Sequence, residues 1–365
     1  MGSRLGVIVL AESGPELYYD HWAAQTVGLD IALDGFEATL ARVRSMTPMG
    51  VDTPAQWHGA TWIEGSLLID LIQRHVVWAE ESSYLYLPRI VNHLIEKTWP
   101  GWSAVWSPEG VRGTLWLTGV DPATIFTENS YSQRTVEDLT WFVPWAEGGT
   151  CDALSVRLDS EQVIAWRGEG SLDFIAQLGP DLIRSVAVEA LARSGAGEPV
   201  LWDSERCNEG PATGIHLDFT TKTARWWAIC DDDRQIDAFD GLWPGWSVET
   251  VGDAYEFHEH ATGKPMRSWA EEIGTVRDTV QRMLSNGPRE NPLLRVASLM
   301  ADQGEQITIN AAALKFEPAS DFSGAPRAIA ALDELDAVRP LTPARFVNRH
   351  GQVFEPSPSG RWPGP

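Results

Sequence analysis

The chain repeats part of itself, and this repeat constrains its fold more than any other feature. The segment Trp99–Ser103 (WPGWS) returns as Trp243–Ser247. A second match lies upstream of each copy, where an apolar run ends in Asp70 in one case and in Asp218 in the other. A tryptophan follows each aspartate eight residues later, and the copies are offset by 148 residues at the aspartates and by 144 at the WPGWS segments. Two matches in one order, at nearly one offset, indicate a tandem duplication of a unit of domain size.

Each half of this duplication shows hairpins that alternate with helices. We expect hairpins over 66–79 and 214–228, because β-rich runs there flank short polar turns. Apolar residues at helical spacing predict helices over 36–43, 88–97 and 268–284. Antiparallel hairpins that alternate with helices predict an α+β fold with largely antiparallel sheets, not a doubly wound parallel sheet.

The domain boundaries follow from the repeat. We place the first unit at residues 1–148 and the second at 150–265, followed by a helical and hairpin extension over 266–345. Residues 346–365 are rich in Pro, Ser and Gly, which is typical of a disordered tail. We expect the two units to pack with pseudo-two-fold symmetry and to leave a groove between them for a ligand or partner.

The charge balance is the second strong feature. Asp and Glu total 51 against 28 Lys and Arg, which gives a formal net charge of −23. Such a charge repels phosphate backbones and anionic membrane surfaces, so we expect neither nucleic acid nor membrane as a partner. It favours solubility or recognition of a basic partner. The three cysteines, Cys151, Cys207 and Cys230, lack CxxC spacing, so we expect a reducing cytoplasm rather than a disulfide framework or a zinc ribbon.

The third feature is the content of 18 tryptophans. Several alternate along the predicted strands, which indicates packing in the core, and an aromatic platform for a ligand is the alternative. In the WPGW motifs we expect Pro to end a helix, Gly to allow a tight turn, and Trp99 and Trp243 to be buried.

Histidines and carboxylates near predicted strand ends are the candidate catalytic groups. His21, His58 and Glu64 can line one cleft of the first unit, and a histidine beside acids can act as a general base with a raised pKa. Asp20 and His21 alternate along a strand, however, so only one of them can face a given site. The matching Asp70 and Asp218 favour a role in turns over one as site carboxylates, because Asp is common where strands end.

The sequence His258-Glu259-His260 is the sharpest local signal for a metal. On a strand, residues two apart share a face, so both imidazoles could reach one ion. A third ligand is missing, so we predict no metal and no cofactor, with His258 and His260 as outside candidates. The run Asp231–Asp233 lacks the glycine and distal glutamate of a calcium loop, which favours a solvated turn.

Two classes of function remain. The first is an acidic binding protein, such as an inhibitor or immunity-type partner that neutralises a basic protein. The second is an enzyme that acts on a small molecule or peptide between the two units, using histidines and carboxylates. We favour binding, because the chain has no GxGxxG, P-loop, GxSxG or kinase motif. The residues expected to form an acidic face are Asp231, Asp232, Asp233, Asp237, Asp240, Glu249, Asp253, Glu256 and Glu259.

Overall fold

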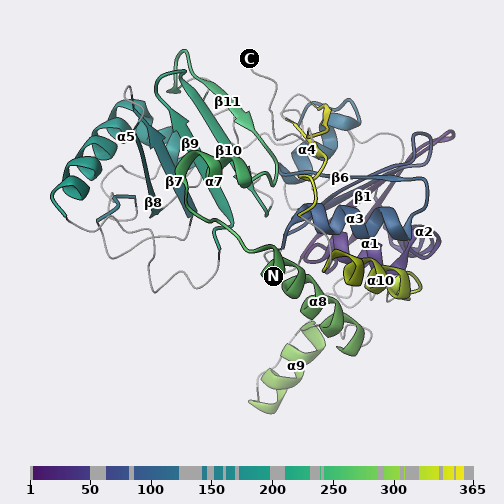
Figure 1. The fold of residues 1–365 in the computed structure, drawn as a ribbon. Helices are drawn as coiled ribbons and strands as arrows, with labels where there is room; N and C mark the ends of the chain where they lie inside the picture. Colours follow the sequence, from purple (N-terminus) through teal and green to yellow (C-terminus); the bar gives the residue numbers. More distant parts are fainter. Residues whose placement is uncertain are drawn as a thin grey trace. The chain divides into compact units, whose positions relative to one another are not determined.

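The structure is a computed structural model that describes residues 3–49, 63–81, 86–122, 142–145, 152–158, 162–168, 172–197, 210–230, 239, 242–286, 292–304, 308, 320–336, 340–348 and 351–356. Helices alternate with the strands of two sheets (Figure 1), so the predicted α+β class is confirmed. The chain divides into two compact units. The first contains 1–84, 91–105 and 273–339, and the second contains 85–90, 106–272 and 340–365. Each unit joins distant segments, whereas the predicted boundaries follow sequence order; those boundaries and the duplication itself stay predictions.

The first unit is built on strands in the order β6-β5-β4-β1-β2-β3. These strands are β1 (Leu5–Ala11), β2 (Gly14–Asp20), β3 (Thr47–Pro48), β4 (Gly65–Asp70), β5 (His75–Ala79) and β6 (Ser103–Trp106). Strand β1 pairs antiparallel with β2 and parallel with β4, and β4 forms a hairpin with β5. The helices with residues in this unit are α1 (Val27–Asp34), α2 (Phe36–Ser45), α3 (Pro88–Thr98), α8 (Trp269–Asn286), α9 (Pro292–Asp302) and α10 (Ala325–Leu335).

The second unit contains a five-stranded sheet in the order β11-β10-β9-β7-β8. Its strands are β7 (Asp152–Arg157), β8 (Val163–Gly168), β9 (Thr213–Asp218), β10 (Thr223–Ala228) and β11 (Ser247–Thr250). The helices α4 (Gly110–Leu117), α5 (Leu172–Gly195) and α7 (Glu256–Thr262) belong to this unit. Two short strands, β12 (Phe346–Val347) and β13 (Val353–Phe354), pair with each other, and Phe346 pairs with Trp106 at the end of β6. The segment predicted as a tail thus contains two short strands among its described residues, and the extent of a disordered tail stays a prediction.

The two predicted hairpins are confirmed as β4–β5 and β9–β10, and the helices over 36–43, 88–97 and 268–284 are confirmed as α2, α3 and α8. The sheets are mixed rather than largely antiparallel, since β1 pairs parallel with β4, and β7 pairs parallel with β9. In each case helical structure connects the second strand of one hairpin to the first strand of the next. Such a crossover brings the two hairpins into one sheet through a parallel pair.

Two segments that resemble strands in sequence are helices. Gly113–Leu117 lies in α4, and the segment from Glu256 to His260 lies in α7. Aromatic and β-branched residues favour strands only where a neighbouring strand is available to pair with them. The first segment follows β6 and the second follows β11, and there tertiary packing decides the backbone conformation.

The matching aspartates form turns, as predicted. The Oδ1 atom of Asp70 accepts the backbone N–H groups of Ile72 and Gln73 at 2.8 and 2.9 Å. The Oδ1 atom of Asp218 accepts the N–H of Thr220 at 2.8 Å and that of Thr221 at 3.3 Å. Each carboxylate thus accepts backbone N–H groups that have no backbone acceptor within the tight hairpin turn.

The two WPGW motifs have one structural role. Trp99 and Trp243 are buried, with 0% and 1% of their surface exposed, so the predicted burial is confirmed. The indole N–H of Trp99 donates to the carbonyl oxygen of Ile31 in the last turn of α1, at 2.9 Å. The indole N–H of Trp243 donates to the carbonyl oxygen of Ala176, near the break in α5, at 3.0 Å. Each indole therefore donates to a carbonyl close to a helix end. The Ile31 carbonyl also accepts the N–H of Gly35, whereas Pro180 has no N–H to offer the Ala176 carbonyl.

Candidate functional site

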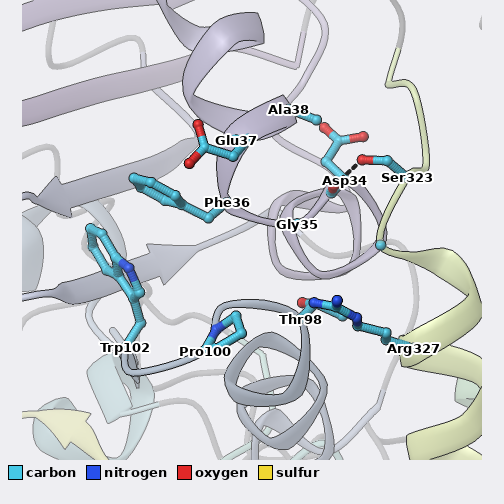
Figure 2. Close-up of a pocket in the computed structure, with 11 residues that line it drawn as sticks. Asp34, Gly35, Phe36, Glu37, Ala38, Thr98, Pro100, Trp102, Ser323 and Arg327 are labelled. Carbon is cyan, nitrogen blue, oxygen red and sulfur yellow. Dashed lines mark hydrogen bonds between the residues drawn. The ribbon is translucent and has the colours of Figure 1, made fainter.

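A pocket of about 420 Å³ lies in the first unit, at the corner between α1 and α2 (Figure 2). Gly35 makes this corner, with φ 76° and ψ 175°, a conformation that is essentially restricted to glycine. Its N–H closes α1 by donating to the carbonyl oxygen of Ile31, and its carbonyl oxygen accepts the N–H of Thr39 to open α2. The lining residues are Asp34, Gly35, Phe36, Glu37, Ala38, Thr98, Pro100, Trp102, Ser323, Gly324 and Arg327.

One wall of the pocket is aromatic. The rings of Phe36 and Trp102 lie 4.8 Å apart with a tilt of 34°, and the ring of Trp102 meets that of Trp99 edge to face at 5.2 Å. Because Trp99 is fixed in the core by its bond to Ile31, it holds Trp102 in place. The second tryptophan of the first WPGW motif thus provides a firm apolar surface, on which a planar or aliphatic group can pack.

The charged groups of the pocket differ in how they are engaged. Asp34 is occupied: its carboxylate accepts the Arg42 guanidinium at 2.8 Å and the backbone N–H of Phe322 at 3.3 Å. Burial raises the pKa of Asp34, and Arg42 opposes that rise. The side chains of Arg327 and Glu37 are exposed, and neither makes a hydrogen bond or an ion pair with another described residue. Figure 2 shows Arg327 reaching from α10 toward the α1–α2 corner, with Glu37 on the far side of the pocket.

The first turn of α2 contributes to the same pocket. Phe36, Glu37 and Ala38 form that turn, and no side chain caps it. The first N–H groups of a helix have no acceptor within the helix, and the helix dipole makes this end attractive to anions. The pocket therefore combines a guanidinium, a helix N-terminus, an aromatic wall and two carboxylates, of which Asp34 is paired with Arg42.

The predicted catalytic residues that the structure describes are not among those that line the pocket. Two of them, His21 and Glu64, both neighbour Arg4: Glu64 accepts the Arg4 backbone N–H at 2.7 Å, and burial and Arg4 lower the pKa of His21. The raised pKa expected of a general base beside acids is therefore not found. The Nδ1 atom of His21 is hydrogen-bonded to the hydroxyl of Tyr19 at 2.9 Å. His58 lies outside the described residues, so the catalytic trio stays untested as a group.

The metal hypothesis for His258 and His260 assumed a strand, and this assumption is wrong. Both residues lie in α7, where side chains two positions apart point to nearly opposite sides. His258 is completely buried and His260 is exposed, so one ion cannot bind both. Across the described ranges, no group of three or more His, Cys, Asp or Glu side chains is arranged to hold a metal.

The predicted acidic face is corrected in part. Asp253 is buried and paired with Arg89, which also pairs with Glu256. Glu249 pairs with Arg225, and Glu259 accepts the backbone N–H of Met266 at 2.7 Å. These four acids stabilise the second unit internally rather than forming a free acidic surface. The other predicted members, Asp231, Asp232, Asp233, Asp237 and Asp240, lie outside the described residues.

The pocket could not have been found from local sequence, because it joins α2 to α10 almost 300 residues away in the chain. The signals that were available are the WPGW motif, which supplies Trp102, and Gly35 between two helical segments. No helix among the described residues combines the length and apolar character needed to cross a bilayer. Comparison with known proteins finds no match: neither a family model, nor a curated protein, nor a solved structure matches this chain.

Proposed function

We propose that this chain is a binding protein and that the pocket of its first unit takes a ligand with a carboxylate on an apolar body. One observation carries the proposal: Arg327 and Glu37 bring opposite charges to one pocket beside the Trp102 wall, and neither side chain is paired in the described part of the chain. Ligand pockets commonly combine an apolar wall with a few polar groups that orient the ligand.

The two charged side chains would contact different groups of the ligand. The Arg327 guanidinium can hold a carboxylate through two parallel hydrogen bonds, and the first turn of α2 favours the same negative charge. Glu37 repels a ligand that carries only negative charge and attracts one that also has an ammonium or guanidinium group. The pocket therefore fits a zwitterion, such as an apolar amino acid or a short peptide, better than a plain carboxylic acid.

Calorimetry with three related probes tests this assignment. L-Tryptophan carries both charges, N-acetyl-L-tryptophan carries only the carboxylate, and L-tryptophan methyl ester carries only the ammonium group. We expect the wild-type protein to bind L-tryptophan most tightly of the three. Arg327→Ala should weaken binding of N-acetyl-L-tryptophan at least tenfold, which corresponds to about 1.4 kcal/mol. Glu37→Gln should leave that probe bound as well or better, because it removes a repulsion.

The matched control is Arg282→Ala, which removes an exposed arginine of α8 that does not line the pocket. It should leave the affinity of all three probes unchanged. If Arg282→Ala and Arg327→Ala weakened probe binding equally, the effect would come from the loss of positive charge in general and not from a contact in the pocket. If Arg327→Ala left the affinity of all three probes unchanged, the proposal would be contradicted.

A second candidate function is recognition of a basic protein by the acidic surface. The observation that favours it is the net charge of −23, together with the engagement of many arginines in ion pairs inside the described units. Such arginines include Arg42, Arg89 and Arg267, whose partners are Asp34, Asp253 and Glu272. Each such pair removes one cation and one acid together, so the excess of acids stays with the remaining charged groups.

A further inference from the structure

A continuous chain of buried polar side chains connects α7 to the sheet of the second unit. The indole N–H of Trp227 on β10 donates to Nδ1 of His258 at 3.0 Å. The Nε2 atom of His258 lies 2.6 Å from the hydroxyl oxygen of Ser155 on β7. That hydroxyl lies 2.7 Å from Nδ1 of His216 on β9. All four residues are buried, so the chain of contacts is shielded from water.

The contacts fix where each proton lies. Trp227 can only donate, so Nδ1 of His258 is an acceptor and its proton is on Nε2. His258 then donates to the Ser155 oxygen, and the Ser155 hydroxyl donates to Nδ1 of His216. Each of the three contacts then joins one donor to one acceptor, and this arrangement requires both imidazoles to be neutral.

Proton uptake breaks this order. A proton on Nδ1 of His258 would face the indole N–H of Trp227, donor against donor, at a distance that needs an acceptor. A proton on Nδ1 of His216 would leave the Ser155 hydroxyl with donors on both sides and no acceptor in this chain for its own proton. A buried donor without an acceptor loses its hydration free energy and gains nothing in return. Either event therefore weakens the attachment of α7 to the sheet.

A glycine in strand β9 leaves the space that this chain of hydrogen bonds needs. A Cβ atom on Gly214 would overlap the indole nitrogen of Trp227 and would lie 2.9 Å from Nδ1 of His258. Glycine is therefore needed opposite Trp227 for the indole to meet the imidazole. The positions of the same register in the first unit are apolar: Ile8, Leu68 and Ala79 stand where Ser155, His216 and Trp227 stand in the second. A plain apolar core is thus a workable alternative in this sheet, and the second unit departs from it.

We propose that Trp227, His258, Ser155 and His216 form an acid-sensitive latch that holds α7 on the sheet near neutral pH and releases it when the histidines take up protons. The charged groups around the latch oppose protonation on balance. His216 is faced by Arg157 of β7 and Arg225 of β10, against Asp218 on its own strand. His258 is faced by His216 and by Arg167 of β8.

The direction of the effect follows from the folded and unfolded pKa values. Burial lowers the pKa of His216 to about 4 and the pKa of His258 well below its ordinary value. A free histidine titrates near pH 6.5. The latch is therefore fully stabilising above about pH 6.5, and its stabilisation is lost as pH falls from there toward 4. For His216 alone, linkage predicts that the open population rises on the order of thirtyfold between pH 8 and pH 5.

Hydrogen exchange of α7 amides, corrected for the intrinsic pH dependence of exchange, measures this opening. We expect α7 in the wild type to open at least thirtyfold more at pH 5 than at pH 8, while α5, which contributes no residue to the latch, changes little. In the double variant His216→Leu with His258→Gln, the rise should shrink to threefold or less. Leu copies Leu68 of the first unit, and Gln keeps an acceptor for Trp227. His260→Gln, an exposed change on the same helix, is the control and should respond as the wild type does.

The wild-type protein keeps the proposal testable even where the double variant does not fold. Nitrogen chemical shifts of the imidazoles should show His258 as the neutral Nε2–H tautomer at pH 8. A charged His258 or the opposite tautomer at pH 8 would overturn the latch. So would an acid response of α7 that is no larger than that of α5, or one that persists in the folded double variant.

Discussion

At the scale of single residues, the tryptophans of the WPGW motifs show how one side chain can support both a core and a site. Trp99 fills the core and satisfies the Ile31 carbonyl, and its ring then supports Trp102 at the pocket wall. Trp243 and Trp246 repeat the same pair of rings at 4.9 Å with the same edge-to-face tilt of 83°. The motif therefore joins a buried anchor to a more exposed second ring.

We expect Trp99→Phe to reduce the free energy of unfolding by about 2 kcal/mol. Roughly 1 kcal/mol of this is the lost hydrogen bond to Ile31, and the remainder is the space that the smaller ring leaves empty. Trp99→Ala should cost more, about 3–5 kcal/mol. Urea denaturation followed by circular dichroism measures both. Trp102→Phe, at a half-buried ring with no recorded indole bond, should cost clearly less than Trp99→Phe; an equal cost would mean that the Ile31 bond contributes little.

At the scale of elements, the sequence predicts hairpins and amphipathic helices well because their signals are local. The hairpin turns carry Asp70 and Asp218, and the long helices α3 and α8 carry clear apolar spacing. The helix α7 was missed because the alternation in His258-Glu259-His260 was taken as the mark of a strand. Three residues are too few to distinguish a strand from a helix, and the packing of the segment is not visible in the sequence. The latch and the pocket were missed for a different reason: both join residues that are distant in the chain, and neither leaves a periodic trace.

The break between α1 and α2 gives an element-scale prediction. At Gly35 the backbone has φ 76° and ψ 175°, so a Cβ atom there is strained even though its nearest contact, the Thr98 oxygen, lies at 3.5 Å. We expect Gly35→Ala to destabilise the protein by about 1–3 kcal/mol and to weaken probe binding in the pocket. The control is Gly274→Ala in the interior of α8, where a Cβ atom meets nothing within 4 Å.

The control should act in the opposite direction. Alanine replaces glycine in an ordinary helical conformation at position 274, so the free energy of unfolding should rise by up to about 1 kcal/mol. Thermal denaturation of the two variants side by side measures the contrast. Stabilisation by Gly35→Ala would show that the α1–α2 corner relaxes to an ordinary helix and that the pocket does not depend on it.

At the scale of the whole molecule, acidity is the property that single sites do not explain. Asp34, Asp253 and Glu272 are buried against arginines, and such acids add nothing to the outward field. The field instead depends on the remaining acids, and the run Asp231–Asp233, which lies outside the described residues, is the densest group of acids in the sequence. The proposal that this chain recognises a basic protein therefore rests on that run rather than on its neighbours Glu249, Glu256 and Glu259.

If this acidity serves recognition, it should act on the rate of association. Exposed charges are screened within about 8 Å at physiological ionic strength, so the rate with a lysine-rich peptide should fall steeply as salt rises. Changing Asp231, Asp232 and Asp233 together to Asn should lower the rate at low salt and flatten its salt dependence.

The matched control changes Glu12, Asp278 and Asp302, which are exposed and scattered over the first unit, to their amides. This control removes the same net charge without touching the run. Stopped-flow measurement at two salt concentrations separates the outcomes, because equal losses in both variants would mean that only total charge matters. The acidity would then be a property of solubility, and the pocket beside Trp102 would be the better-supported place where this protein meets its ligand.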